Sequence, residues 1–233
     1  MVSRIARKGS LLRSLAASSL LLLSSVTLAA DWQLEMDDSG VQLYSKTSDT
    51  SQLKTVKVVS QVKASLSSLV SFLSDHNQFP AWMDKVSKVE KIKDISPQES
   101  LTYTVIDSPW PERDRDNVLY SKWEQDPKSL IVTKKIYSEP GHVGEASDMI
   151  RAPFFEGEWK LVPKGEGLVE VSYTVDFEPG GKVQGWLLEM FTYEMPFKTM
   201  QNLRTAGLDK YEGAKFAFIK EPVKTGVAMT TQQ

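Results

Sequence analysis

Apolar and polar residues alternate most regularly between Leu168 and Phe177, in the last third of the chain. The apolar positions are Val169, Val171, Tyr173, Val175 and Phe177, and polar residues lie between them. Successive side chains of a β-strand point to opposite faces, so the pattern predicts a strand with one strongly apolar face. That face requires an apolar partner elsewhere in the chain.

An amphipathic helix is predicted after the turn sequence Glu178-Pro-Gly-Gly181. With about 100° of rotation per residue, five large side chains fall within about 40° of one line and form an apolar stripe: Trp186, Met190, Tyr193, Phe197 and Met200. Pro196 removes the backbone hydrogen bond to the Thr192 carbonyl, so a kink is expected there. The stripe should cover the apolar face of the strand. Its Met and Trp side chains either fill a core or leave an adaptable ligand cavity.

Shorter alternating runs predict a sheet that begins near residue 32. A hairpin is expected from Trp32–Met36 and Val41–Lys46, joined by the turn residues Asp37-Asp-Ser-Gly40. Thr55–Lys63 has valines on one face and lysines on the other, which is typical of a half-buried strand. Further strands are expected at Leu101–Ile106, Asn117–Trp123, Leu130–Tyr137 and Glu158–Leu161. Sequential antiparallel pairing is the simplest topology for these strands.

Two short helices are predicted after the third strand. Ser65 is placed to cap a helix in which Leu66, Leu69, Val70 and Leu73 recur at helical spacing. A second turn of helix should hold Phe79, Trp82 and Met83. The segment between Ser138 and Glu156 reads as a loop, with a helical turn over Glu145–Arg151.

The first thirty residues have the features of a secretion signal. Arg4, Arg7, Lys8 and Arg13 precede a short apolar run from Leu15 to Leu23, and small residues end the segment at Ala30. We therefore expect a cleavable Sec-type signal peptide at residues 1–30 and a periplasmic or secreted mature protein. An uncleaved N-terminal anchor is the alternative. The remaining chain is of a length and composition typical of one globular domain.

Net charge and composition exclude several classes of function. Cleavage lowers Lys plus Arg from 28 to 24 against 30 acidic residues, so the mature chain has a net charge of −6 and lacks the basic surface of a nucleic-acid-binding protein. The chain has no Cys, which excludes disulfides, thiolate metal sites and Cys nucleophiles. His76 and His142 are the only histidines, and neither has a metal-ligand partner at a suitable spacing. We expect no metal site, no cofactor and no catalytic site.

One charged segment stands out, Pro109-Trp-Pro-Glu-Arg-Asp-Arg-Asp116. In a strand, Arg113 and Arg115 would point to one face and Asp114 and Asp116 to the other. Either these charges are solvated in a rigid loop, or a buried Arg pairs with a carboxylate or a ligand head group, because an unpaired buried charge costs several kcal/mol.

An ordered series of motifs resembles the START domains, within the START, polyketide-cyclase and Bet v 1-like superfamily. The series comprises Pro109-Trp-Pro with Arg113-Asp-Arg-Asp116, Trp159-Lys-Leu-Val-Pro163, Asp176-Phe-Glu-Pro-Gly-Gly181, Trp186-Leu-Leu and Pro196-Phe-Lys-Thr-Met-Gln-Asn-Leu-Arg204. The resemblance implies an α+β helix-grip fold, in which a curved antiparallel sheet wraps around a long C-terminal helix and encloses a cavity for an apolar ligand. It implies a START-like domain at residues 31–212. Beyond about Tyr211 the apolar pattern fades, which predicts a loose tail at residues 213–233.

The resemblance also implies a set of ligand-binding residues. Arg115 is the expected inward polar group, for a head group or a buried acid. Phe197 is expected in the core. The other expected cavity residues are Trp82, Tyr103, Tyr173, Trp186, Met190 and Tyr193.

Three functions are consistent with these residues. The favoured one is a monomeric periplasmic protein that binds a lipid or another hydrophobic molecule, transfers or senses it, and makes transient contact with a membrane surface. The second is a cyclase-like or hydrolase-like enzyme, for which His142 with a nearby carboxylate is the candidate acid–base pair. The third is an interaction module that uses the 138–155 loop and Trp110 as its partner surface.

Overall fold

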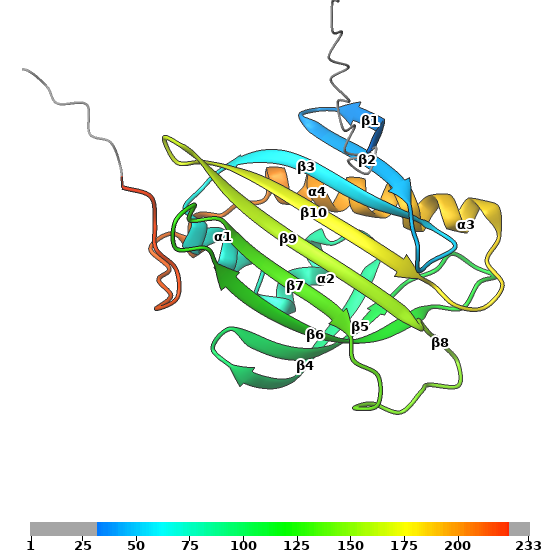
Figure 1. Cartoon of the computed structure of the whole chain (residues 1–233). Helices are drawn as coiled ribbons and strands as arrows, with labels where there is room; N and C mark the ends of the chain where they lie inside the picture. The colour runs from blue at the N-terminus through cyan, green and yellow to red at the C-terminus, as the bar shows by residue number, and fades with distance from the viewer. Residues whose placement is uncertain (1–31, 224–233) are drawn as a thin grey trace, which may run out of the picture. The chain divides into compact units, whose positions relative to one another are not determined.

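The computed structural model describes residues 32–223, which form an α+β fold (Figure 1). Its ten strands are β1 (Gln33–Asp38), β2 (Val41–Thr47), β3 (Lys54–Lys63), β4 (Val86–Ser96), β5 (Glu99–Ile106), β6 (Arg115–Gln125), β7 (Val132–Ser138), β8 (Ile150–Arg151), β9 (Phe154–Gly165) and β10 (Leu168–Glu178). The helical elements are α1 (Leu66–Phe72), η1 (His76–Gln78), α2 (Phe79–Trp82), α3 (Gly185–Glu189), the π-helical η2 (Met190–Glu194), α4 (Met195–Thr205) and η3 (Asp209–Tyr211).

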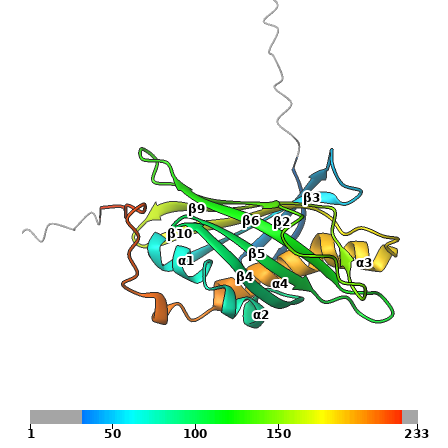
Figure 2. The same cartoon turned by 90° about the horizontal axis from the view of Figure 1, so that it is seen from below.

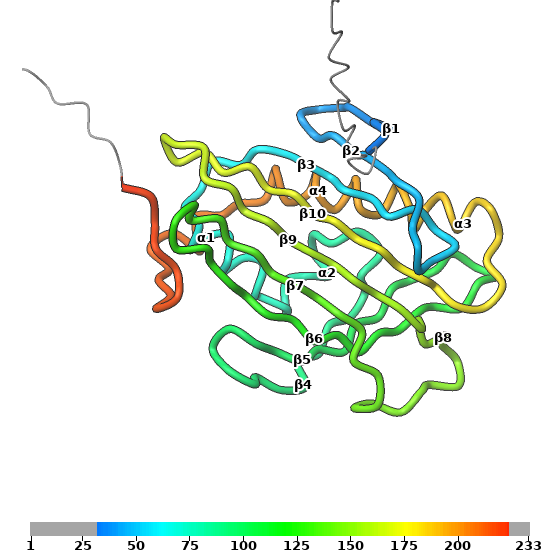
Figure 3. The backbone as a smooth tube through the Cα atoms, in the orientation of Figure 1, coloured from blue at the N-terminus to red at the C-terminus, as the bar shows by residue number. Residues whose placement is uncertain are grey.

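One curved sheet contains all ten strands, in the order β1-β2-β3-β10-β9-β7-β6-β5-β4, with β8 parallel to the start of β6 (Figure 3). The prediction of sequential pairing fails at one point, because β3 pairs with β10 and not with β5, the next strand that was predicted. The helices between β3 and β4 carry the chain from the centre of the sheet to its far edge (Figure 2). The two halves of the sheet are thus joined through β10, the last strand of the chain order.

Local sequence signals explain several elements. The β1–β2 hairpin turns through Ser39 and Gly40, both at positive φ, which glycine adopts without strain. The Ser65 side chain accepts a hydrogen bond from the Ser68 backbone N–H and so caps α1, as predicted. The apolar positions of β10 are all buried, so the alternation in that segment correctly identified its inner face.

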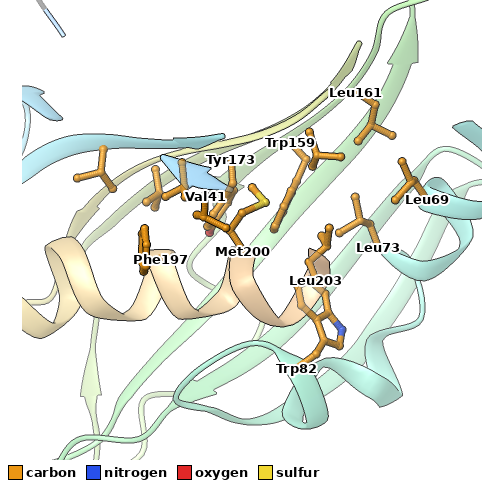
Figure 4. Packing of buried hydrophobic residues seen from close by; sticks show 14 of the residues in the cluster. Val41, Leu69, Leu73, Trp82, Trp159, Leu161, Tyr173, Phe197, Met200 and Leu203 are labelled. Carbon is orange, nitrogen blue, oxygen red and sulfur yellow. The ribbon is translucent and has the colours of Figure 1, made fainter. Parts of the chain in front are cut away.

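The core lies between the concave face of the sheet and the C-terminal helix. Figure 4 shows Phe197, Met200 and Leu203 of α4 directed toward the sheet, opposite Tyr173 and Trp159. All five side chains are buried in the main hydrophobic cluster, which confirms the core position of Phe197. The predicted helix-grip fold, with a curved antiparallel sheet and a long C-terminal helix, is therefore confirmed.

The C-terminal helix differs from prediction in its register. At the end of the π-helical segment the Met195 N–H donates to the Met190 carbonyl, five residues earlier, immediately before Pro196. Such a segment accommodates one extra residue and so rotates the following residues by roughly 100°. The five-residue stripe is consequently divided, and Trp186 is 42% exposed whereas Met200 is fully buried.

Three segments differ from the sequence prediction. The strand β4 was not predicted, because most of its residues are polar and exposed at the edge of the sheet. The predicted helical turn over Glu145–Arg151 is not formed, and residues 150–151 pair with β6 as β8. The strand β9 is far longer than the predicted Glu158–Leu161, because its polar outer residues interrupt the apolar pattern.

The described part of the predicted loose tail is attached to the domain. Phe216, Phe218 and Ile219 pack against the core. The Glu221 carboxylate accepts hydrogen bonds from the backbone N–H groups of Leu66 and Ser67, at 3.0 and 2.7 Å, at the N-terminus of α1. A carboxylate is favourable there because the first N–H groups of a helix have no intrahelical partner. Residues 224–233, like the predicted signal peptide at residues 1–30, lie outside the described residues.

Candidate functional site

An internal cavity lies beneath the part of the sheet formed by β5, β6, β7, β9 and β10. Its floor is supplied by η1, α2 and the first residue of α4. The apolar lining includes Phe79, Met83, Ile136, Trp159, Tyr173 and Met195. The polar lining consists of His76, Thr102, Thr104, Asn117, Ser121 and Lys134. An apolar cavity with a few converging polar groups is the usual form of a small-molecule site.

The cavity is narrow in this conformation. Its volume is about 70 Å3, counted as the space open to the centre of a water molecule. One buried water needs roughly 10–15 Å3 on that measure, whereas ligand pockets typically measure roughly 300–1,000 Å3. The cavity therefore accommodates a few water-sized groups, and a lipid chain requires its walls to move. The walls on the helical side include two flexible methionines, Met83 and Met195, together with Phe79, and these side chains would have to move.

Aromatic rings form the wall at one end of the cavity. Trp159 and Tyr173 stack at 4.2 Å between ring centroids with an angle of 12° between their planes. Trp82 contacts Trp159 edge-on at 6.0 Å (Figure 4). It also contacts Phe79 edge-on, at 5.5 Å. Trp82 does not line the cavity. It lines a second pocket of about 400 Å3 between α2 and the end of α4, and so separates that pocket from the cavity.

Lys134 is the charged group of the cavity, and the sequence analysis missed it. Its side chain is 4% exposed, and its Nζ donates to the Leu73 carbonyl at 3.0 Å. The rings of Trp123 and Phe79 lie 5.4 and 5.8 Å from Nζ. Burial lowers the pKa of Lys134 to about 8. A signal was present in the sequence, because Lys134 occupies an apolar face between Val132 and Ile136.

Asn117 is the second unusual polar group of the cavity. Its side-chain oxygen and nitrogen are both buried, and neither has a hydrogen-bond partner within residues 32–223. Buried amides usually form hydrogen bonds, since an unsatisfied group costs about 1–3 kcal/mol. Asn117 thus offers a donor and an acceptor to whatever occupies the cavity.

Arg115 does not line the cavity, although it points to the same face of β6 as Asn117. Its side chain is fully buried, and Nη2 lies 3.6 Å from the Glu112 carboxylate, an ion pair too long for a hydrogen bond. Nη1 donates to the Ser108 hydroxyl at 3.1 Å and to the Arg113 carbonyl. Burial lowers the pKa of Arg115, and the Glu112 carboxylate opposes that shift. The sequence analysis predicted either a ligand head group or an acid as the partner of Arg115, and in the structure this partner is the Glu112 carboxylate.

Tyr103 lies on the opposite face of the sheet from the cavity. It belongs to a separate apolar cluster with Leu101, Val105 and Val118. Its hydroxyl donates to Asp116 Oδ2 at 2.9 Å. Burial, reinforced by that hydrogen bond, raises the pKa of Tyr103 to about 12. A one-residue step along a strand reverses the face, which places Tyr103 away from the predicted ligand site.

The three helix residues predicted to contact ligand also lie outside the cavity. Met190 is buried in the main core, Trp186 is partly exposed on α3, and Tyr193 lies 5.9 Å from the Lys54 ammonium. The rotation introduced by the π-helical segment explains why Met195 reaches the cavity in their place. Of the predicted site residues, the structure places only Tyr173 in the cavity wall.

Neither histidine forms a catalytic arrangement in residues 32–223. His76 lines the cavity, and burial, reinforced by the Lys134 charge, lowers the pKa of His76 to about 4. His142 is on the exposed 139–149 loop, where its Nε2 lies 3.9 Å from the Glu139 carboxylate. No group of three potential metal ligands is found in these residues. The helices of this part of the chain are all too short or too polar to cross a membrane.

Known proteins share this fold and its sequence pattern. The model of the START domain family matches residues 15–212. The uncharacterized protein PA1579 of Pseudomonas aeruginosa is 31% identical over 199 residues, which cover 85% of this chain and 98% of the relative. A crystallised STAR-related lipid transfer protein fragment from Xanthomonas axonopodis is 29% identical, with a TM-score of 0.68 and coverage of 75% of this chain and 97% of that chain. Human StAR-related lipid transfer protein 5 has a TM-score of 0.70 at 14% identity, covering 79% and 89% of the two chains, which shows similarity of fold. The chain belongs to the START domain family.

Proposed function

We propose that the mature protein is a periplasmic lipid-binding protein that carries one hydrophobic ligand in the cavity beneath the sheet and acts as a monomer. The observation that supports this proposal is the apolar cavity itself, enclosed by the sheet, α2 and α4 and lined by a few polar groups with free hydrogen-bonding capacity. The similarity to a STAR-related lipid transfer protein from Xanthomonas axonopodis agrees with it. Burial of an alkyl chain there supplies affinity at about 25 cal/mol per Å2.

Ligand uptake requires the helical floor of the cavity to move. The α2 helix has only four residues, and two side chains of α4 hold its C-terminal end. The Asn202 side chain donates to the Trp82 carbonyl at 2.9 Å, and the Thr199 hydroxyl accepts from the Asp84 N–H at 3.0 Å. Breaking these two bonds releases Phe79 and Met83 from the cavity. Trp82, which packs against Phe72 and Trp159, would move with this segment.

Membrane contact is proposed for the loop before β6. Trp110 is 91% exposed between two prolines. The next residues connect the loop to α3, because the Gln184 amide donates to the Glu112 carboxylate at 3.3 Å. Trp186 is also partly exposed on α3. Tryptophan side chains are favourable at membrane–water interfaces, so these two residues would direct this end of the domain toward a lipid surface.

Secretion rests on the signal sequence predicted at residues 1–30. Expression of the full chain with a C-terminal tag should yield a shortened protein in the periplasmic fraction, with Asp31 or a neighbouring residue as its N-terminus. Full-length protein in the membrane fraction would instead support the anchor.

Lipid carriage is tested by extraction of the purified mature protein followed by mass spectrometry. We expect acyl lipid at near-stoichiometric amounts. Thr104→Met should reduce it, because a flexible side chain would occupy the cavity that Thr104 lines. Thr133→Met is the matched control, since Thr133 is on the other face of β7 and does not line the cavity. Lipid no more abundant than on an unrelated periplasmic protein, or equal in both variants, would contradict the proposal.

A further inference from the structure

Lys134 has spare hydrogen-bonding capacity inside the cavity. An ammonium group carries three N–H donors, and the Leu73 carbonyl accepts one of them at 3.0 Å. The rings of Trp123 and Phe79 pack beside the ammonium, as is usual for a desolvated cation. Two N–H donors are therefore available to the contents of the cavity.

In the described part of the chain, no negative charge compensates Lys134. None of the residues that line the cavity is Asp or Glu. No carboxylate within residues 32–223 forms an ion pair with Lys134. His76 also lines the cavity, and burial keeps its imidazole neutral at neutral pH. The cavity thus carries a net positive charge.

Other buried cations of the domain are compensated. Arg151 forms two hydrogen bonds of 2.9 Å with the Asp116 carboxylate, and Arg115 lies 3.6 Å from Glu112. A buried ammonium without a counter-ion is unfavourable, and this domain pairs its other buried cations. The missing partner of Lys134 is best supplied by the ligand. Although burial lowers the pKa of Lys134 to about 8, the side chain is still protonated in most molecules at pH 7.

We propose that Lys134 binds the acidic group of the ligand, so that the cavity selects single-chain amphiphiles with a carboxylate or phosphate monoester over neutral or zwitterionic ones. This inference rests on the proposed function and names its ligand class. The acid would lie beside the Leu73 carbonyl and η1. The alkyl chain would follow β7 past Ile136 toward Phe155, both of which line the cavity.

The test is displacement of the neutral dye Nile red from the purified mature protein at pH 7, below the micelle concentration of each competitor. Four competitors share one alkyl chain and differ in head group: dodecanoate, dodecyl phosphate, dodecanol and dodecylphosphocholine. At least one of the two acids should bind about tenfold or more tightly than dodecanol, because hydrogen bonds to charged groups are the stronger class. Dodecanoate and dodecyl phosphate separate a fatty acid from a phosphate head group.

Lys134→Met should weaken binding of the preferred acid about tenfold or more, and its effect on dodecanol binding should be much smaller. Lys135→Met is the matched control, because Lys135 is the neighbouring residue on the exposed face of β7. Equal affinities for acids and dodecanol, or an acid affinity unaffected by Lys134→Met, would overturn the inference while leaving the proposed function intact. Failure of every competitor to displace the dye would overturn both.

A second measurement keeps the inference testable if Lys134→Met does not fold. The carboxyl carbon of isotope-labelled dodecanoate reports its ionisation by NMR. Bound to the unchanged protein, its pKa should lie below that of free dodecanoate, because the neighbouring ammonium favours the carboxylate. A raised pKa would show an acid buried in apolar surroundings and would contradict the pairing with Lys134.

Discussion

Two buried charges on opposite faces of the sheet, Asp116 and Lys134, differ in how completely they are paired. On the convex face, the Asp116 carboxylate accepts two hydrogen bonds from Arg151 and one from the Tyr103 hydroxyl, all at 2.9 Å. On the concave face, Lys134 donates to one backbone carbonyl, and residues 32–223 supply neither an acid to Lys134 nor a hydrogen-bond partner to Asn117. Complete pairing is expected of a structural site, because a buried charge is tolerated when its partners are in place. Incomplete pairing on the cavity side is expected of a ligand-binding surface, where the ligand supplies the remaining partners.

The largest effect should follow from breaking the convex pair. Arg151→Met leaves the Asp116 carboxylate buried without its counter-ion and should lower the free energy of unfolding by about 3–5 kcal/mol. Urea unfolding of the mature protein measures it. Arg113→Met is the control, since Arg113 is exposed and donates only to backbone carbonyls at 3.3 Å or more. Similar losses in both variants would show that the pair is not the source of stability.

A smaller effect should follow from removing one hydroxyl. Tyr103→Phe deletes a hydrogen bond to a buried carboxylate and should cost about 1.5–3 kcal/mol. Tyr173→Phe removes the same atom from the cavity wall, where no carboxylate accepts a hydrogen bond from it, and should cost less than half as much. Urea unfolding measures both losses. Equal midpoints for the two tyrosine variants would contradict a larger contribution from the Tyr103 hydroxyl.

The stability of the protein should depend on pH in a way that reveals Lys134, which is buried and unpaired within residues 32–223. The folded-state pKa of Lys134 is about 8, below its ordinary value of 10.5. Between these pH values the unfolded chain still binds the proton that the folded protein has released, so stability rises as pH increases through this window. Below about pH 8 both states are protonated and the folded protein bears the full desolvation cost.

The Lys134→Met variant does not bear this desolvation cost. Its free energy of unfolding should therefore exceed that of the unchanged protein at pH 7, and the two values should converge by pH 10. Thermal unfolding measured across this range tests the difference, with Lys135→Met as control. A Lys134→Met protein that is markedly less stable than the unchanged protein at pH 7 would make Lys134 a structural residue, like Arg151.

The smallest effect on stability is expected at Trp110. Because this side chain is 91% exposed, Trp110→Ser should change the free energy of unfolding by less than about 0.5 kcal/mol. Its effect should appear in sedimentation with anionic phospholipid vesicles, where the bound fraction should fall severalfold. Unchanged vesicle binding would remove this loop from the proposed membrane contact.

Elements with a strong local signal could be predicted from the sequence. The alternation in β10, the turn at Ser39-Gly40 and the cap at Ser65 each involve residues close together in the chain. The strand β4 gave no such signal, since an edge strand with two solvated faces has no apolar period. The apolar stripe of the C-terminal helix was predicted with ideal geometry, which the π-helical turn before Pro196 interrupts.

The candidate site was harder to predict than the fold. Residues were assigned to the cavity by their family resemblance and by apolar character, and Tyr173 alone is in its wall. Tyr103 was assigned to the wrong face because Leu101, Tyr103 and Val105 form the apolar side of β5, whereas its threonine side lines the cavity. Lys134 was overlooked because a lysine within a strand is ordinarily solvated, and only the packing of α1 and η1 over it buries the charge.

Hydrophobic periodicity alone determined the inner face of the last strand, because it acts over a few positions of the chain, and the ordered motifs indicated the family and with it the fold class. Only the tertiary structure decided which cation has a counter-ion. Arg115 and Lys134 both alternate onto the inner face, yet a carboxylate three residues away in the chain reaches Arg115 and none reaches Lys134. Charge compensation depends on distances between side chains that meet only after the sheet has closed over its helices, and no local pattern encodes those distances.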